Sequence, residues 1–346
     1  MPGEFLSEEQ REYLREFTEE VSEENLIDFF TLSENDMKEV NKHRKSFNKF
    51  GFALQMCILR YSGFCPKNLN NVSPVIAKYI GNQLGIKINV LKEYGKVRKQ
   101  TRTDHLMEIQ EYLGFRKATE LDLYELNKWL TEESVKNDDN YYLYSIACKK
   151  LLKEKIIRPG ITVIERIIVR ARGEGEEEIY NKLSHILTAD IKNRLNESLL
   201  CDSKIKITPL TWLRRNNSRD KAKEIIENIK KLEYLKNLGA HKWDISFLSS
   251  LRLKALSSQA FDYNSQTIKK LKPYRKYPVL LSFFYESYNI IFKRLLDSYK
   301  IFIVNELKES KILTSDLIVP DTINENLKYL QNIDFKEIAA EKENKN

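Results

Sequence analysis

The sequence contains few of the residues that interrupt helices, with 11 glycines and 8 prolines among 346 residues. Their scarcity favours long helices joined by few tight turns, because glycine costs backbone entropy and proline removes a helical hydrogen bond. No apolar run reaches the roughly 18 residues typical of a membrane span, and the opening MPGEFLSEEQ lacks the basic and apolar regions of a signal peptide. We therefore expect a cytoplasmic protein with no membrane partner.

Cysteine and histidine, the usual zinc ligands, are also sparse, at four residues each. The cysteines show no CxxC spacing and lie at Cys57, Cys65, Cys148 and Cys201. This spacing does not fit a zinc site and favours reduced thiols. Gly173 and Gly175 do not form a phosphate loop either, because no Gly-Lys-Ser/Thr follows them. We expect no metal and no cofactor.

Helix-boundary signals, in contrast, recur along the chain. Ser7 followed by Gln10 has the spacing of a capping box at a helix start. Ser73-Pro74 places a cap before a proline, and Gly85 lies where such a helix would end. Apolar residues between these signals repeat at helical spacing. The segment 161–169 is rich enough in β-branched residues for a strand, but its arginines and charged continuation favour a long helix. The sequence therefore predicts an all-α fold.

Charge is distributed unevenly over the first third of the chain. Residues 1–40 contain 13 Asp and Glu against 3 Lys and Arg, whereas residues 41–116 contain 14 Lys and Arg against 4 Asp and Glu. The whole chain carries a formal net charge of +8. A change of sign this abrupt indicates a polyanionic partner for the basic segment.

The basic segment opens with residues 42–61, KHRKSFNKFGFALQMCILRY. Its apolar residues Phe50, Leu54 and Cys57 recur at spacings that bury one face of a helix. A basic head before a packed helix suits a phosphate backbone, because the helix end adds free N–H donors. A run of basic residues can also be a solvated surface. The candidate DNA contacts here are Lys42, His43, Arg44, Lys45, Asn48 and Lys49.

A second basic group follows at residues 96–102. The helices expected at 73–85, 88–94 and 101–113 are separated by glycines, as in a helix-turn-helix unit, in which one helix enters the major groove. Helix spacing alone does not establish such a unit. The candidate DNA contacts in this group are Lys96, Arg98, Lys99 and Arg102.

These residues also carry a family resemblance. The stretch TLSENDMKEVNKHRKSFNKFGFALQMCILRYSGF resembles the opening of the Tn-three-type transposases, the large enzymes of replicative bacterial transposons. A second matching stretch is RKQTRTDH, at residues 98–105, with Leu113-Gly114-Phe115 after it. Weaker similarity continues through Thr211-Trp212-Leu213-Arg214 and the run 248–297.

The resemblance implies a helical region that recognises the terminal inverted repeats of a transposon. It also implies that the acidic DDE nuclease core of the family lies beyond the end of this sequence. The expected partner is then double-stranded DNA, in a nucleoid-associated protein, and self-association is left open. Two arginines in the basic segment 205–231 complete the candidate DNA contacts, Arg214 and Arg215.

We divide the chain into five segments on these grounds. Tandem DNA-binding units resembling helix-turn-helix domains occupy residues 1–66 and 67–116. A helical linker or scaffold follows at 117–204, a helical domain with basic patches at 205–309, and a polar tail at 310–346.

Catalysis by this chain is not expected. Phosphoryl transfer on DNA needs two or three carboxylates that converge on Mg²⁺ from a rigid frame. The Asp and Glu residues here fall on predicted helix surfaces and caps, so we assign no catalytic residue. The alternative to a DNA-binding protein is a helical interaction or regulatory module derived from a transposase, which binds DNA only weakly.

Overall fold

The computed structural model describes residues 5–17, 21–66, 68–201, 206–215 and 221–309. These residues form sixteen α-helices, three short 3₁₀ helices and two strands of two residues each, β1 (Arg116–Lys117) and β2 (Ile156–Ile157). The two strands pair in parallel. The all-α fold expected from the sequence is confirmed.

The chain divides into two compact units, residues 1–175 and 176–346. The boundary falls inside helix α10 (Ile161–Lys182). The finer division into five segments stays a prediction, and its tail, 310–346, lies outside the described residues.

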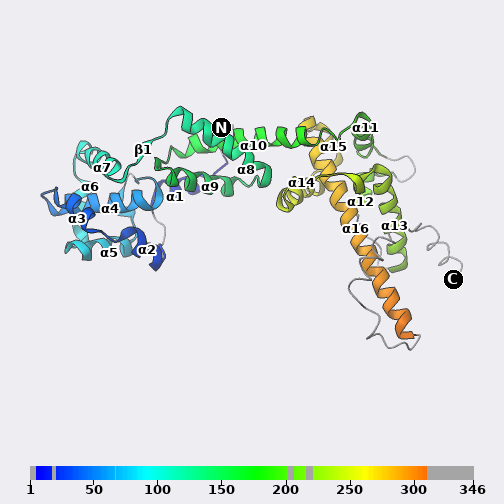
Figure 1. Cartoon of the computed structure of the whole chain (residues 1–346), viewed down its shortest axis with the longest axis horizontal. Helices are drawn as coiled ribbons and strands as arrows, with labels where there is room; N and C mark the ends of the chain where they lie inside the picture. Colours follow the sequence, from blue (N-terminus) through cyan, green and yellow to red (C-terminus); the bar gives the residue numbers. More distant parts are fainter. Residues whose placement is uncertain (1–4, 18–20, 67, 202–205, 216–220, 310–346) are drawn as a thin grey trace. The chain divides into compact units, whose positions relative to one another are not determined.

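The first part of unit one is built around a single helix (Figure 1). Helix α4 contacts five other helices of this part. The bounds of its six helices are α2 (Glu23–Phe30), α3 (Glu34–Asn41), α4 (Ser46–Ser62), α5 (Pro74–Leu84), α6 (Leu91–Gly95) and α7 (Lys99–Leu113). Helix α1 (Glu8–Arg15) precedes them and packs through Leu14 against the second core of unit one. One hydrophobic core runs through this part, from Phe17 to Ile109.

The sequence of α4 explains its central place. All ten residues from Phe50 to Leu59 are buried, so the helix is enclosed on every side. Gly51 lies directly against the ring of Tyr94 from α6, where a Cβ would overlap the ring atoms. The helix ends at Gly63, whose φ of 72° is a left-handed conformation that glycine adopts without steric cost.

The local signals of this part are confirmed at several helix ends. Ser7 and Gln10 form the predicted capping box of α1. Proline 74 occupies the first position of α5, and Gly85 follows its end with φ of 65°. The helix expected to begin near Thr101 begins two residues earlier, at Lys99.

A second core of unit one is formed by α8 (Glu120–Lys136), α9 (Asn140–Lys153) and the first part of α10. The sequence before Pro159-Gly160 predicts one helix over 141–157, and this prediction is wrong at its C-terminal end. Helix α9 stops at Lys153 and Lys155 adopts a positive φ of 53°. Residues 156–157 then pair with β1 instead. Backbone pairing with a strand 40 residues away decides this end, and no local pattern records it.

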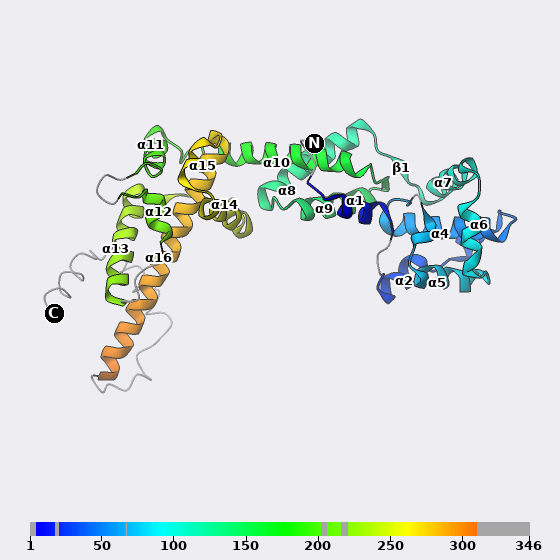
Figure 2. The same ribbon diagram turned by 180° about the vertical axis from the view of Figure 1, so that it is seen from behind.

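Unit two packs its helices against one long helix, α16 (Pro273–Glu309), which Figure 2 shows alongside α13. Its aromatic residues Phe283 and Phe284 are fully buried. The other helices are α11 (Ala189–Glu197), α12 (Pro209–Arg214), α13 (Lys221–Leu238), α14 (Ser250–Asp262) and α15 (Ser265–Lys270). The apolar sequence of residues 278–302 predicts a helix, and this segment lies inside α16.

Candidate nucleic-acid interface

The basic head at 42–45 forms the loop between α3 and α4. Its cations Lys42, Arg44 and Lys45 are exposed, whereas the His43 side chain retains 11% exposure. The ring of His43 lies 4.4 Å from that of Phe52 and 4.4 Å from that of His105, measured between centroids. The loop is therefore anchored on the core through its histidine and presents its cations to solvent.

His105, the ring neighbour of His43, belongs to a buried chain of hydrogen bonds. Nδ1 of His105 lies 2.9 Å from the Tyr94 hydroxyl, which donates to Oε1 of Gln55 over 3.1 Å. On the other side, Nε2 of His43 lies 3.5 Å from a carboxylate oxygen of Glu108 on α7. This chain joins the α3–α4 loop, α4, α6 and α7.

Burial governs the charge of both histidines. Burial is the main reason that the pKa of His105 is lowered to about 4, and the neighbouring His43 is a second reason. Burial also lowers the pKa of His43, although Glu108 opposes that shift. Both rings are therefore predominantly neutral at pH 7, and their part in this interface is to position the loop.

The second basic group lies at the start of α7. Lys96, Arg98 and Lys99 are all exposed, with Arg98 at the N-cap and Lys99 as the first helical residue. Neither α7 nor α4 has an acidic residue in its first turn. The partial positive charge of both helix starts is thus left uncompensated by side chains. Together with Arg44, these cations have no ion-pair partner among the described residues.

The remaining candidates of unit one have partners or are partly covered. Lys42 pairs with Glu39 at 2.5 Å, and Nζ of Lys49 donates to Oδ1 of Asn41 over 2.7 Å. The Nζ atom of Lys45 lies 5.4 Å from the Phe47 ring centroid. Two half-buried candidates each have a covered atom without a hydrogen-bond partner in the described structure: Oδ1 of Asn48 and Nε of Arg102.

Arg214 and Arg215 lie in unit two, at the end of α12. Nη2 of Arg214 donates to the carbonyl oxygen of Tyr263 over 2.8 Å, and its guanidinium lies 6.0 Å from the Phe283 ring centroid. Burial lowers the pKa of Arg214. These contacts hold α12 against its neighbours. Arg215 is exposed, and its carbonyl oxygen accepts from Nζ of Lys231 over 2.8 Å.

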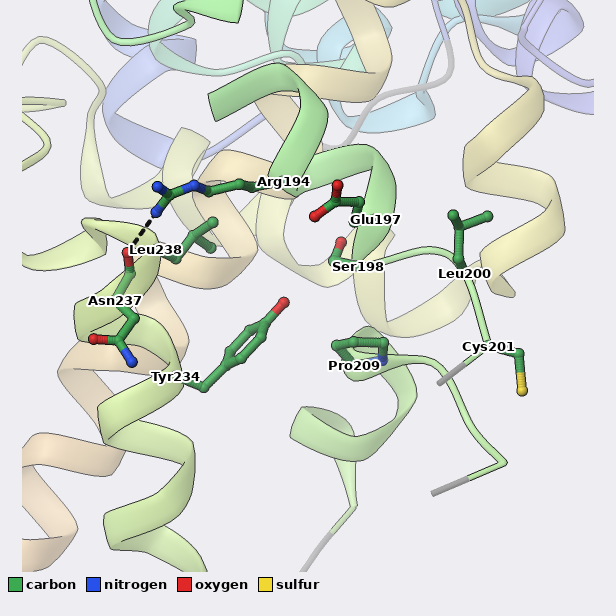
Figure 3. Close-up of a pocket in the computed structure, with 9 residues that line it drawn as sticks. All are labelled: Arg194, Glu197, Ser198, Leu200, Cys201, Pro209, Tyr234, Asn237 and Leu238. Carbon is green, nitrogen blue, oxygen red and sulfur yellow. Dashed lines mark hydrogen bonds between the residues drawn. The ribbon is translucent and has the colours of Figure 1, made fainter. Parts of the chain in front are cut away.

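Unit two also contains a pocket of about 430 Å³ between α11, α12 and α13 (Figure 3). Arg194 there donates to the carbonyl oxygen of Asn237 over 2.8 Å and pairs with Asp190 at 3.1 Å. Burial raises the pKa of Tyr234 to about 12, with Glu197 as a second cause. The arginine of this pocket is already engaged, so we do not place a nucleic-acid contact here.

Sequence reasoning missed two polar residues of unit one, Gln55 and Tyr94. Gln55 is 6% exposed and Tyr94 is 1% exposed. The one available signal was a glutamine within the apolar run of α4. Within the described ranges, no group of three or more His, Cys, Asp or Glu residues is placed to hold a metal ion.

Known proteins resemble this chain over most of its length. A family model described as "Domain of unknown function (DUF4158)" matches residues 5–171. The transposase for transposon Tn1546 of Enterococcus faecium is 30% identical over 279 residues, which cover 80% of this chain and 28% of that protein. The transposase for transposon Tn21 of Escherichia coli is 26% identical over 292 residues, covering 84% and 29%. The chain is related to the Tn-three-type transposases.

This finding confirms the resemblance seen in the sequence. A further relative, the transposase for transposon gamma-delta of Escherichia coli (strain K12), is 24% identical over 286 residues, covering 82% of this chain and 28% of its own length. The chain thus spans less than a third of the length of these transposase relatives. In the part of the chain that the structure describes, no helix is long and apolar enough to cross a membrane.

Proposed function

We propose that this transposase relative binds double-stranded DNA and recognises transposon terminal inverted repeats through the α3–α4 loop and the start of α7. The proposal assigns no strand-transfer chemistry to the chain. Its main support is the set of exposed cations Arg44, Lys96, Arg98 and Lys99, which lack carboxylate partners among the described residues. The sequence relationship to transposases makes DNA the polyanion that these cations would meet.

The two basic segments belong to one interface in this proposal. The contacts of His43 with His105 and Glu108 hold the α3–α4 loop against α7, in the same hydrophobic core. The lysines are compact charges suited to phosphates, which position the protein on a duplex. An arginine can instead donate two hydrogen bonds to O6 and N7 of guanine. We assign that reading role to Arg44, which is exposed in the loop.

The experiment begins by selecting a binding site from a pool of random duplexes. Affinity for the selected duplex and for a scrambled one is then measured by fluorescence anisotropy. Arg44→Ala should weaken the selected duplex about 5- to 150-fold, because a bidentate contact to guanine contributes about 1–3 kcal/mol of discrimination. It should weaken the scrambled duplex much less. Lys99→Ala should weaken both equally.

Lys78→Ala is the matched control, because it removes an exposed positive charge from α5, outside the proposed interface. A pool that yields no enriched sequence would contradict inverted-repeat recognition. If Arg44→Ala lost affinity equally for both duplexes, the interface would bind the DNA backbone without reading its sequence. Nicking of the selected DNA in Mg²⁺, lost when one carboxylate is replaced, would overturn the assignment of no catalysis. Sedimentation with and without DNA would test self-association.

A further inference from the structure

Beside the exposed cations of the proposed interface, unit one contains a polar pocket of about 270 Å³. It lies between the 3₁₀ helix η1 (Leu69–Asn71), the end of α6 and the first turns of α7. Apart from Leu69 its lining is Gln55, Asn68, Asn70, Tyr94, Gly95 and Arg102. Arg102 is the one charged side chain in this lining, which contains no carboxylate.

The guanidinium of Arg102 has no anionic partner among the described residues. The side chain is half-buried, and its Nε is covered without a hydrogen-bond partner in the described structure. No carboxylate of the described residues pairs with it. Arg102 and Tyr94 line the same pocket, and the charge of Arg102 opposes the rise in the pKa of Tyr94 that burial causes. A partly desolvated cation is costly without a charged partner, and a guanidinium matches the oxygens of a phosphate in geometry.

The neighbouring amides have their acceptors occupied and their donors available. Oδ1 of Asn68 accepts from the backbone N–H of Asn70 over 3.1 Å. Oε1 of Gln55 accepts from the Tyr94 hydroxyl over 3.1 Å, and His105 holds that hydroxyl from the other side. The NH₂ groups of both amides therefore remain as donors. A pocket of one guanidinium and several N–H donors favours an anion over a cation.

Gly95 lets the second asparagine come close. A Cβ at this position would lie 3.1 Å from Nδ2 of Asn70, closer than most Cβ contacts. Glycine thus leaves room for that amide beside the backbone at the end of α6.

We propose that this pocket binds a phosphate group and that, in the DNA complex, it holds one backbone phosphodiester. The second half rests on the proposed function, and the first does not. In this assignment Arg102, one of the candidate DNA contacts named from the sequence, binds the DNA backbone and does not read a base. The covered Nε and the lining place the guanidinium in a pocket, whereas the cations at 96–99, about one helical turn earlier, are exposed.

The first test uses inorganic phosphate on the full chain, followed by NMR of arginine Nε–H and side-chain amide signals. Phosphate should shift the Arg102 Nε–H and Asn70 amide signals saturably, and sodium chloride at equal ionic strength should not. Asn70→Ala, a small change at an exposed site, should weaken this binding severalfold without loss of fold. Identical responses to chloride and phosphate, or no saturable shift, would overturn the phosphate site.

The second test separates a DNA phosphodiester from free phosphate. Single phosphates of a bound duplex are replaced one at a time by uncharged methylphosphonates. Replacement of the phosphate at one position should lower the affinity of the wild type about tenfold and that of Arg102→Gln less than twofold. Lys78→Ala should respond to the replacements as the wild type does. Arg102→Lys should retain part of the penalty, because it keeps the charge.

The outcomes distinguish the two proposals. Phosphate binding by a protein that does not bind DNA would refute the proposed function and leave a site for free phosphate. DNA binding in which no methylphosphonate penalty depends on Arg102 would overturn the phosphodiester assignment and leave the proposed function standing.

Discussion

At the scale of single residues, the basic head of α4 contains side chains with opposite roles. His43 and Arg44 are adjacent in sequence and were both candidate DNA contacts. The structure turns His43 onto Phe52 and His105, and leaves Arg44 exposed. A neutral imidazole pair in a core makes the protein sensitive to acid, because the unfolded chain binds protons that the folded chain excludes.

We expect the first unit to lose stability as the pH falls from 6.5 towards 4. The pKa of His105 falls from 6.5 when unfolded to about 4 in the fold, so in this range the unfolded state binds more protons. The stabilising effect is complete above pH 6.5. Hydrogen exchange of α4 peptides, corrected for the intrinsic rate at each pH, measures this loss of stability.

The control for this experiment is His105→Gln, whose amide can still bond to Tyr94. It should flatten the dependence between pH 6.5 and 5, leaving only the contribution of His43, whose neighbours include Glu108, Glu39, Lys42 and Lys49. Asp104 acts on His105 itself, by raising its pKa. An unchanged pH profile in the variant would show that other groups cause the loss.

Asp36 offers a second residue-scale prediction. It is 2% exposed and accepts from Arg60 over 2.6 Å, Tyr112 over 2.9 Å and the backbone N–H of Ser33 over 2.9 Å. Burial raises its pKa, but these partners together lower it below the usual value. Asp36→Asn should lower the free energy of unfolding, measured in urea, by about 2–3 kcal/mol, because Arg60 loses its charged partner.

The exposed pair between Lys136 and Glu133 provides the comparison, since the Lys136 side chain is 62% exposed. Lys136→Ala should cost less than about 0.5 kcal/mol, because water and salt screen the pair. Comparable losses in the two variants would mean that the Asp36 network adds little beyond a surface ion pair.

At the scale of elements, the central place of α4 depends on Gly51, which has no side chain and so lets a neighbouring helix pack closely. Tyr94 of α6 occupies the space where a Cβ of Gly51 would lie, and its hydroxyl then reaches Gln55, one turn further along α4. The same close approach thus supports the core, the histidine chain and the wall of the polar pocket.

Gly51→Ala should therefore lower the free energy of unfolding by about 1–3 kcal/mol, the range of core overpacking. Gly173→Ala in α10 should raise it by up to about 1 kcal/mol, because alanine is the better helix former and no atom lies within 4 Å of a Cβ at that position. Urea unfolding of both variants measures the difference. If Gly51→Ala were neutral, the contact with Tyr94 would not be a close one in solution.

At the scale of the whole molecule, two features predict a strong dependence of DNA binding on salt: the net charge of +8, and the cations of unit one that have no carboxylate partner among the described residues. Each neutralised phosphate releases counterions and adds about 0.9 to the slope of log K against log salt concentration. Lys99→Ala should reduce the magnitude of that slope by roughly one. Anisotropy titrations at several salt concentrations measure it. A shallow slope, unchanged in the variant, would favour the alternative of a protein-interaction module.

Much of the fold was decided locally and could be predicted. A cap such as Ser7 with Gln10 acts over three residues, and a glycine such as Gly85 ends a helix through its own backbone conformation. Helical periodicity likewise depends on neighbours three or four residues apart. The all-α class, most helix positions and the relationship to transposases were therefore accessible from the sequence.

The sequence by itself determined most helix starts and ends and where positive charge accumulates along the chain, whereas the end of α9 depended on strand pairing. Only the tertiary structure decided which of the basic side chains remain free. His43 was turned inward by α7, Arg102 was half-covered in a pocket, and Arg214 was engaged by Tyr263, 49 residues away. The physical reason is distance along the chain, because burial and partnering depend on elements that no local pattern specifies.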